Sequence, residues 1–166
     1  MALQDKIDYS IALIRKAERL ALSMSPEGFH VSFSGGKDSQ ALLELVKMAG
    51  VKYIAEYSVT GNDPPDNVRF IRDKYPEVVM YHPPRKFIQL ITTNGLPFRQ
   101  HRYCCALLKE GRGDGKVVLT GVRAEESARR SSYNEVSLYS HKGRQFGGRR
   151  TIEQVEENEH RCVGGK

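Results

Sequence analysis

The chain has 166 residues, of which 28% are charged and 39% are hydrophobic. This composition is typical of a globular domain, and it excludes a membrane-spanning chain because no apolar run approaches the roughly 18 residues that a bilayer requires. The net charge of +6 favours anionic partners, either nucleotides or nucleic acid, without choosing between them. The N-terminus is charged and periodic, unlike a signal peptide, so we expect a cytoplasmic protein with no membrane partner.

The first elements are predicted from apolar spacing. Residues 4–24 repeat at helical intervals and predict one amphipathic helix, ended by the turn at 25–28. Residues 30–34 predict a short buried strand. A helical pattern follows over 37–48, and Gly50 is placed to end that helix.

The chain then continues to alternate between the two kinds of element. Further strands are predicted at 52–59, 78–81 and 116–120, and further helices at about 66–74, 86–93 and 103–110. Strands that alternate with helices indicate an α/β protein, here a three-layer α/β/α fold with a mainly parallel, twisted, Rossmann-like sheet.

The junction between the first strand and its helix carries the sequence Ser34-Gly35-Gly36-Lys37-Asp38-Ser39. Glycines let backbone N–H groups close around an anion, and the positive end of the helix dipole points to the same place. The lysine adds a cation, and the serines add hydroxyl donors. Because ligands of an open parallel sheet bind beyond the carboxyl ends of its strands, the sequence predicts a phosphate-binding loop here.

The loop does not match the two commonest phosphate-binding patterns. A Walker A loop requires glycine five residues before the Gly-Lys pair and Ser or Thr after the lysine, whereas Val31 and Asp38 occupy those positions. The GxGxxG spacing of a dinucleotide site is absent as well. A glycine turn followed by a charged first helical turn is the simpler interpretation of the same residues.

Four motifs, in order over residues 31–130, resemble one group of nucleotide-binding proteins. They are Ser34-Gly35-Gly36-Lys37-Asp38-Ser39, Thr60-Gly61, Arg102-Tyr103-Cys104-Cys105 and Thr120-Gly121-Val122-Arg123-Ala124-Glu125-Glu126-Ser127. The first looks like the SGGKDS signature of the PP-loop superfamily, also called the adenine-nucleotide alpha-hydrolase-like fold. Within it, the chain most resembles the phosphoadenosine phosphosulfate (PAPS) reductase family, particularly its shorter phage-type and DNA-sulfur-modification-like members.

The resemblance implies an enzyme that binds an adenine nucleotide, ATP or PAPS/APS, and acts at its α-phosphate. With ATP, attack at the α-phosphorus would release pyrophosphate and yield AMP, in chemistry linked to sulfur metabolism or transfer. The transferring group requires charge neutralisation, for which Lys37, Arg123, the loop N–H groups and Mg²⁺ are candidates. Asp38 either helps to hold the metal or caps the helix. Further nucleotide contacts are expected in the other motifs, at Thr60, Gly61 and Gly121.

Three arginines follow the last predicted strand. Arg123 follows the end of the predicted strand, which is a ligand-facing position. A guanidinium binds phosphate or sulfate through bidentate hydrogen bonds. Arg129 and Arg130 are candidates for the same role. Alternatively, they pair with the glutamates at 125–126 on a solvated helix.

The three cysteines, with Cys104 and Cys105 adjacent, do not form the framework of a secreted disulfide protein. Relatives that carry a four-iron cluster use such a tandem pair with downstream cysteines, and Cys162 could supply a third thiolate. A 4Fe–4S cluster takes four thiolates, so the fourth would be missing, come from another chain or leave an iron open to substrate. Buried structural thiols are the alternative.

Two other functions remain open. The family name suggests reduction of PAPS or APS, but such reductases use a nucleophilic cysteine in an ECGxH-like motif, and Cys162 lacks the glutamate before it and the histidine after it. The other function is a nucleotide- or nucleic-acid-binding module without turnover, whose site a second copy or a partner protein would complete. Tyr133, Tyr139 and Phe146, among basic residues, could contact bases and phosphates. A solvated, partly disordered tail is the simpler interpretation of the same residues.

We expect a single domain over residues 1–166, because no repeat or linker interrupts the chain. Its parts would be an N-terminal helix (1–28), the nucleotide-binding core (29–130) and an irregular basic tail (131–166).

Overall fold

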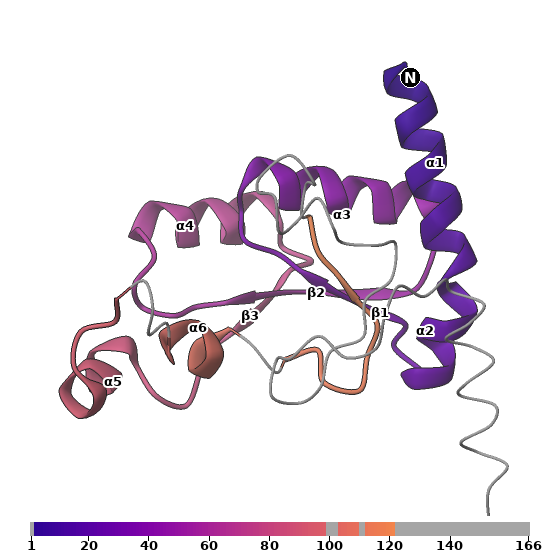
Figure 1. Ribbon diagram of the computed structural model, residues 1–166. Coiled ribbons are helices and arrows are strands. Elements are labelled where there is room, and N and C mark those ends of the chain that lie inside the picture. Colours follow the sequence, from indigo (N-terminus) through magenta and orange to yellow (C-terminus); the bar gives the residue numbers. More distant parts are fainter. Residues whose placement is uncertain (1, 99–102, 110–111, 122–166) are drawn as a thin grey trace, which may run out of the picture.

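A computed structural model describes residues 2–98, 103–109 and 112–121 of the chain (Figure 1). Helices and strands alternate along it as expected. The helices are α1 (Leu3–Lys16), α2 (Glu18–Met24), α3 (Lys37–Ala49), α4 (Pro65–Lys74), α5 (Phe87–Asn94) and α6 (Tyr103–Leu108). The strands are β1 (Phe29–Ser32), β2 (Tyr53–Ser58), β3 (Val79–Tyr81) and β4 (Val118–Leu119).

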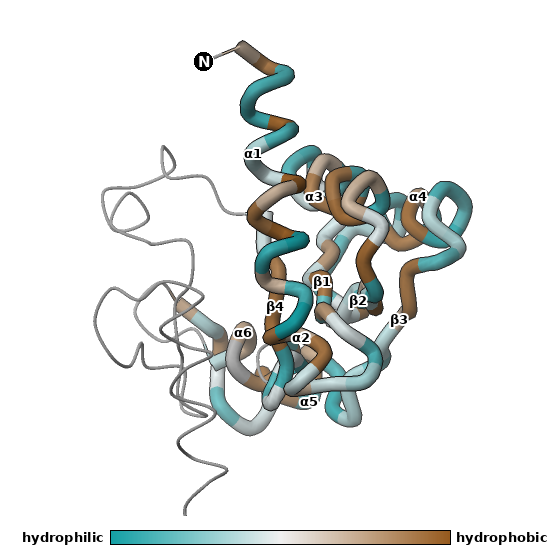
Figure 2. The backbone as a smooth tube through the Cα atoms, turned by 90° about the vertical axis from the view of Figure 1, so that its right-hand side faces the viewer, coloured by the Kyte–Doolittle hydropathy of each residue, from teal (hydrophilic) through white to brown (hydrophobic). Residues whose placement is uncertain are grey.

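The four strands form one parallel sheet in the order β3-β2-β1-β4. Helices α3 and α4 lie on one side of this sheet, with α1 against α3, and helices α2, α5 and α6 lie on the other (Figures 1 and 2). The three-layer α/β/α fold predicted from the sequence is therefore confirmed. None of the described helices is long and apolar enough to cross a membrane.

The strand order places a topological switch point between β1 and β4. From β1 the chain steps outward through α3 to β2 and through α4 to β3, and it then returns past α5 and α6 to β4 on the far side of β1. The helices of the outward connections from β1 to β3 and those of the return connection to β4 lie on opposite faces of the sheet, as right-handed crossovers require. Ligands of such sheets bind at the carboxyl ends of the strands beside the switch point.

The core lies on the central strands and the inner faces of their helices. Phe29 and Val31 of β1 are almost completely buried, as are Leu43 of α3 and Ile71 of α4. Because β1 is covered on both faces, three of its four residues are buried, and only Ser32, next to the glycine loop, is exposed. This rigid centre supports the loop that follows β1.

A charged pair on the sheet ties the turn before β4 to β2. Glu56 of β2 is only 8% exposed and accepts two hydrogen bonds from the Arg112 guanidinium, at 2.7 and 2.9 Å. The Arg112 guanidinium also stacks on Tyr81, 3.7 Å from the ring centroid. The hydrogen bond to Glu56 raises the pKa of Arg112 above its ordinary value. Because a buried carboxylate needs such a partner, the pair fixes the approach of the chain to β4.

The prediction of one helix over residues 4–24 is wrong. The chain forms α1 and α2, which are separated at Ala17, whose N–H is shared between the carbonyls of Leu13 and Ile14. Alanine favours helix and continues the apolar pattern, so propensity does not cause the break. Tertiary packing does, because α1 packs on α3 whereas α2 packs on β1 at the other side of the sheet (Figure 1).

The last predicted strand is also shorter than expected. Of residues 116–120, only Val118 and Leu119 are paired, with His30 and Val31 of β1. Residues 112–115 form a turn, and the Lys116 N–H donates to the carbonyl of Gly113 at 3.0 Å. The turn therefore includes Lys116, the first residue of the predicted strand, and the residues paired with β1 begin at Val118. The irregular tail predicted at 131–166 lies outside the described residues.

Candidate nucleotide-binding site

The glycine loop joins β1 to α3 as the sequence predicts. The Phe33 N–H donates to the Glu56 carbonyl at 2.9 Å, which keeps the chain beside β2 for one residue past β1. Gly35 then takes a positive φ of 78°, which favours glycine, and Gly36 is the extended N-cap of α3. Ser34, Gly36 and Lys37 are exposed. The loop thus presents the N-terminus of a 13-residue helix, a hydroxyl and a cation to one side.

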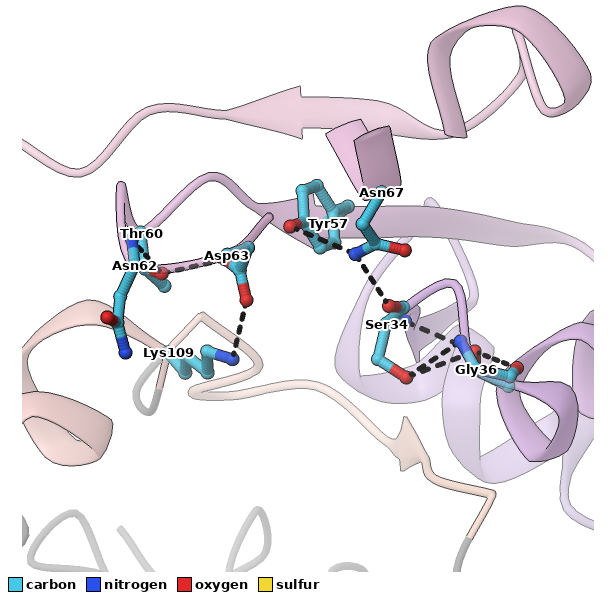
Figure 3. A network of polar contacts seen from close by, with 9 residues as sticks. Ser34, Gly36, Tyr57, Thr60, Asn62, Asp63, Asn67 and Lys109 are labelled. Carbon is cyan, nitrogen blue, oxygen red and sulfur yellow. Dashed lines mark hydrogen bonds and ion pairs between the residues drawn. The ribbon is translucent and has the colours of Figure 1, made fainter. Parts of the chain in front are cut away.

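Two serine hydroxyls organise the loop from within. The buried Ser39 hydroxyl donates to the Gly36 carbonyl at 2.8 Å and accepts the Ser34 N–H at 3.2 Å. The Ser34 hydroxyl lies 3.2 Å from that of Ser39 and 3.5 Å from the Gly36 N–H (Figure 3). Ser39 is therefore an internal brace, whereas the exposed Ser34 hydroxyl lies beside a helix N-terminal N–H where an anion would bind.

Helix α4 closes the loop on one side. A Cβ on Gly35 would lie 2.6 Å from Asn67 Oδ1 and 3.0 Å from Ile71 Cδ1, so no side chain fits there without displacing them. The Asn67 amide is 3.4 Å from both the Ser34 carbonyl and the Tyr57 hydroxyl (Figure 3). Gly35 therefore has two reasons to be glycine, its φ and the close approach of α4.

Gly121 lies on the other side of the loop, just past β4. A Cβ there would be 2.7 Å from the Asp38 carbonyl oxygen and 3.2 Å from the Ser39 backbone nitrogen. The chain that leaves β4 consequently touches the first turn of α3, at the switch point between β1 and β4. The structure thus brings together two of the family-like motifs that are separated by more than 80 residues in the sequence.

The turn after β2 forms a second polar group at the same edge of the sheet. The Thr60 hydroxyl is buried and donates to Asp63 at 2.7 Å, while Gly61 has a positive φ of 79°. The Lys109 ammonium lies 3.7 Å from the other Asp63 carboxylate oxygen (Figure 3). Thr60, which was expected to contact nucleotide directly, therefore shapes this turn, and its hydroxyl is engaged with Asp63.

Opposing effects set the ionisation of this turn. Burial pushes the pKa of Asp63 upward, but the hydrogen bond from Thr60 and the charge of Lys109 outweigh it, so the pKa of Asp63 lies below its ordinary value. Burial, with the nearby Asp63 carboxylate, raises the pKa of Tyr57 to about 12. At neutral pH the ionised Asp63 of the turn therefore lies near the neutral phenol of Tyr57 on β2.

The adjacent cysteines line a small pocket beside this turn. Cys104 and Cys105, both half-buried on α6, face a pocket of about 80 Å³ that Thr60, Phe87 and Leu108 also line. The structure thus brings the cysteine motif next to the Thr60-Gly61 motif. Among the residues described, no group of three or more His, Cys, Asp or Glu side chains could hold a metal ion.

Several predicted site residues lie outside the described residues: Arg123, Arg129, Arg130 and Cys162. Their proximity to the loop stays a prediction, as does a cluster that uses Cys162. The two thiols that are described do not complete the four-thiolate set of a 4Fe–4S cluster. For Mg²⁺, the half-buried Asp38 beside the loop offers the kind of carboxylate that this ion prefers when phosphate oxygens supply its other ligands.

A parallel sheet with a glycine-rich loop at its switch point defines an α/β protein of the nucleotide-binding class. The comparison with protein families agrees: the family model for the phosphoadenosine phosphosulfate reductase domain matches residues 28–153. The chain belongs to this family, within the PP-loop superfamily, and the match supports a nucleotide-binding enzyme of the PP-loop class. No curated protein and no solved structure matches the chain.

Sequence reasoning missed three residues that shape the site: Gln40, Asp63 and Asn67. Asp63 carried a weak signal, because it lies in the turn-rich run that follows Thr60-Gly61. Asn67 and Gln40 carried none, since their partners come from other elements of the fold.

Proposed function

We propose that the chain binds ATP at the loop of residues 34–39 and cleaves it at the α-phosphorus to AMP and pyrophosphate, in a reaction linked to sulfur metabolism or transfer. The observation that carries the proposal is the contact of Gly121 with the first turn of α3. This contact brings the chain after β4, which leads to Arg123, to the exposed end of the phosphate loop. In this proposal Arg123, two residues beyond Gly121 in the sequence, adds a second positive group to the anion site that Lys37 serves.

The residues have distinct roles in this proposal. Backbone N–H groups at the start of α3 and the Ser34 hydroxyl bind phosphate oxygens, and Lys37 and Arg123 neutralise the charge that develops on the transferring group. Asp38 would hold Mg²⁺ together with the phosphates, and this ion would add further neutralising charge. Gly61 and the turn around Thr60 border the site, and Arg129 and Arg130 add longer-range positive potential.

The proposal extends to the kind of family member and to its organisation. We place the chain among the shorter phage-type and DNA-sulfur-modification-like members and treat residues 1–166 as one domain, with the nucleotide-binding core at 29–130. Cys104, Cys105 and Cys162 are the candidate iron–sulfur ligands, and a second copy or a partner protein would supply the missing thiolate. The family match begins at residue 28, next to the start of this core, and extends to residue 153, beyond its proposed end.

A sulfonucleotide reductase is the second candidate, favoured by the thiols that line a pocket beside the Thr60 turn. The sequence around Cys162 weighs against it, because arginine and valine flank this cysteine rather than the residues of an ECGxH-like motif. A binding module without turnover is the third candidate. The net charge of +6 is compatible with nucleic acid as its ligand.

Incubation with ATP labelled at the α-phosphate, in the presence of Mg²⁺, tests the proposal. We expect labelled AMP and free pyrophosphate, and we expect Lys37→Ala to slow product formation about 100-fold. Lys6→Ala removes an exposed cation on α1 and is the matched control. Labelled ADP would show attack at the γ-phosphate and contradict the proposal, binding without products would favour the module, and sulfite from PAPS with a thiol donor would favour the reductase.

A further inference from the structure

Gln40 connects the phosphate loop to helix α4. It lies in the first turns of α3, and its side-chain amide donates to the Gly35 carbonyl at 2.7 Å. The amide oxygen accepts a hydrogen bond from the Tyr75 hydroxyl at 2.8 Å, from the C-cap position of α4. Both distances are typical of well-formed hydrogen bonds. Gln40 is therefore held at both ends and holds one carbonyl of the loop.

The Tyr75 ring is itself fixed in position. It packs against Phe33, with ring centroids 4.9 Å apart, and against Phe70 at 5.8 Å. These are favourable distances for aromatic pairs. Its hydroxyl therefore comes from a rigid part of the fold, and this sets which way the Gln40 amide faces.

The Gly35 carbonyl belongs to the same peptide unit as the Gly36 N–H. All peptide bonds of the described residues are trans, so this carbonyl and this N–H point in opposite directions. With the carbonyl turned toward Gln40, the N–H is directed to the other side of the loop, where it lies 3.5 Å from the exposed Ser34 hydroxyl. Glycine at both positions would otherwise let this peptide rotate with little steric cost.

We propose that Gln40, oriented by Tyr75, is a positioning residue that locks the Gly35–Gly36 peptide so that the Gly36 N–H faces the bound phosphate. The inference rests on the proposed function and deepens it, because it states how an otherwise pliable glycine pair is organised before the nucleotide arrives. A preorganised donor binds an anion more tightly than one that must be ordered on binding.

The test compares three ligands with and without phosphate groups: ATP, inorganic pyrophosphate and adenosine. Gln40→Leu removes the amide with similar bulk, and Tyr75→Phe removes only the hydroxyl while leaving the ring contacts. We expect Gln40→Leu to weaken ATP and pyrophosphate binding about ten-fold, and Tyr75→Phe about three-fold, with adenosine binding unchanged in both. Gln4→Leu, on the exposed face of α1, is the matched control and should bind all three ligands like the parent.

The outcomes separate the two proposals. Unchanged ATP affinity in Gln40→Leu overturns the inference, as does an equal fall for ATP and adenosine, which would indicate a general structural role. Pyrophosphate binding that depends on Gln40, in a protein that does not bind ATP, would support the inference and contradict the proposed function. If the parent protein binds neither anion, both proposals are wrong.

Discussion

Two loops follow neighbouring parallel strands and lie at the same edge of the sheet, yet they use their polar groups differently. The loop after β1 has Gly35 at φ 78°, and the turn after β2 has Gly61 at φ 79°. The first presents the N-terminus of α3 and the exposed Lys37 outward. In the second, the Thr60 hydroxyl and the Lys109 ammonium are both directed at Asp63.

The difference shows that the position after a parallel strand does not by itself make a phosphate site. An anion is attracted by N–H groups and cations that remain directed toward solvent, as in the loop after β1. The turn after β2 has the ionised carboxylate of Asp63 at its centre, which repels phosphate. The nearby cation, Lys109 just after α6, is paired with that carboxylate. We therefore assign the phosphates to the first loop and a shaping role to the second.

Substitution of the glycine in each loop should give the largest difference between the two loops, in the free energy of unfolding. Gly35→Ala must adopt a strained φ and also displace Asn67 and Ile71, so we expect a loss of about 3 kcal/mol in the free energy of unfolding. Gly61→Ala has the same strain in open space, since a Cβ there meets nothing within 4 Å, and should cost about 1 kcal/mol. Urea unfolding of both variants measures the difference, and equal losses would contradict the close approach of α4 to the loop.

Substitution of the lysine near each loop should show a second difference, in the affinity for ATP. Lys37→Ala removes a cation directed at the ligand and should weaken ATP binding by about 2 kcal/mol, roughly 30-fold, less at high salt. Lys109→Ala removes a cation that is engaged with Asp63, so its effect on ATP binding should be under about two-fold. Calorimetric titration of both variants measures the affinities. A larger effect at Lys109 would move the phosphate site to the turn after β2.

The smallest expected effect is a pH dependence at Asp63. Because its pKa is lowered in the folded protein, its ionised form stabilises the fold above the unfolded carboxyl pKa of about 3.9, and this contribution is lost as the pH falls through the folded value. Asp63→Asn should therefore be less stable than the parent at pH 7, with the difference shrinking below about pH 4. Exposed Asp73→Asn is the control for urea unfolding at several pH values, and a difference independent of pH would contradict this assignment.

The parts of the fold that depend on neighbouring residues were predictable from the sequence. The β1–loop–α3 junction was placed almost to the residue because glycines, a helix start and an apolar strand agree within a few positions. Gly50 was correctly identified as the left-handed cap of α3, with φ 69°. Element order and the parallel sheet followed from the same alternation.

The remaining features depend on contacts between distant residues. The break at Ala17 arises because α1 and α2 pack against different layers, which helix propensity does not report. The contact of Gly121 with Asp38, the bond between Gln40 and Tyr75, and the pair of Glu56 with Arg112 each join residues that lie 35 or more positions apart. Periodicity identifies which face of an element is buried, but not the residue that it meets.

The most direct test of the central claim is a titration of the isotope-labelled protein with ATP and Mg²⁺, followed through its backbone amide resonances. We predict that the largest shifts occur at Gly35, Gly36 and Lys37, with smaller changes at Asn62 and Asp63. AMP should shift the same loop resonances, and adenosine should leave them in place. Loop resonances that stay unchanged at saturating ATP, while those of the turn after β2 move, would contradict the assignment of the phosphate site to residues 34–39.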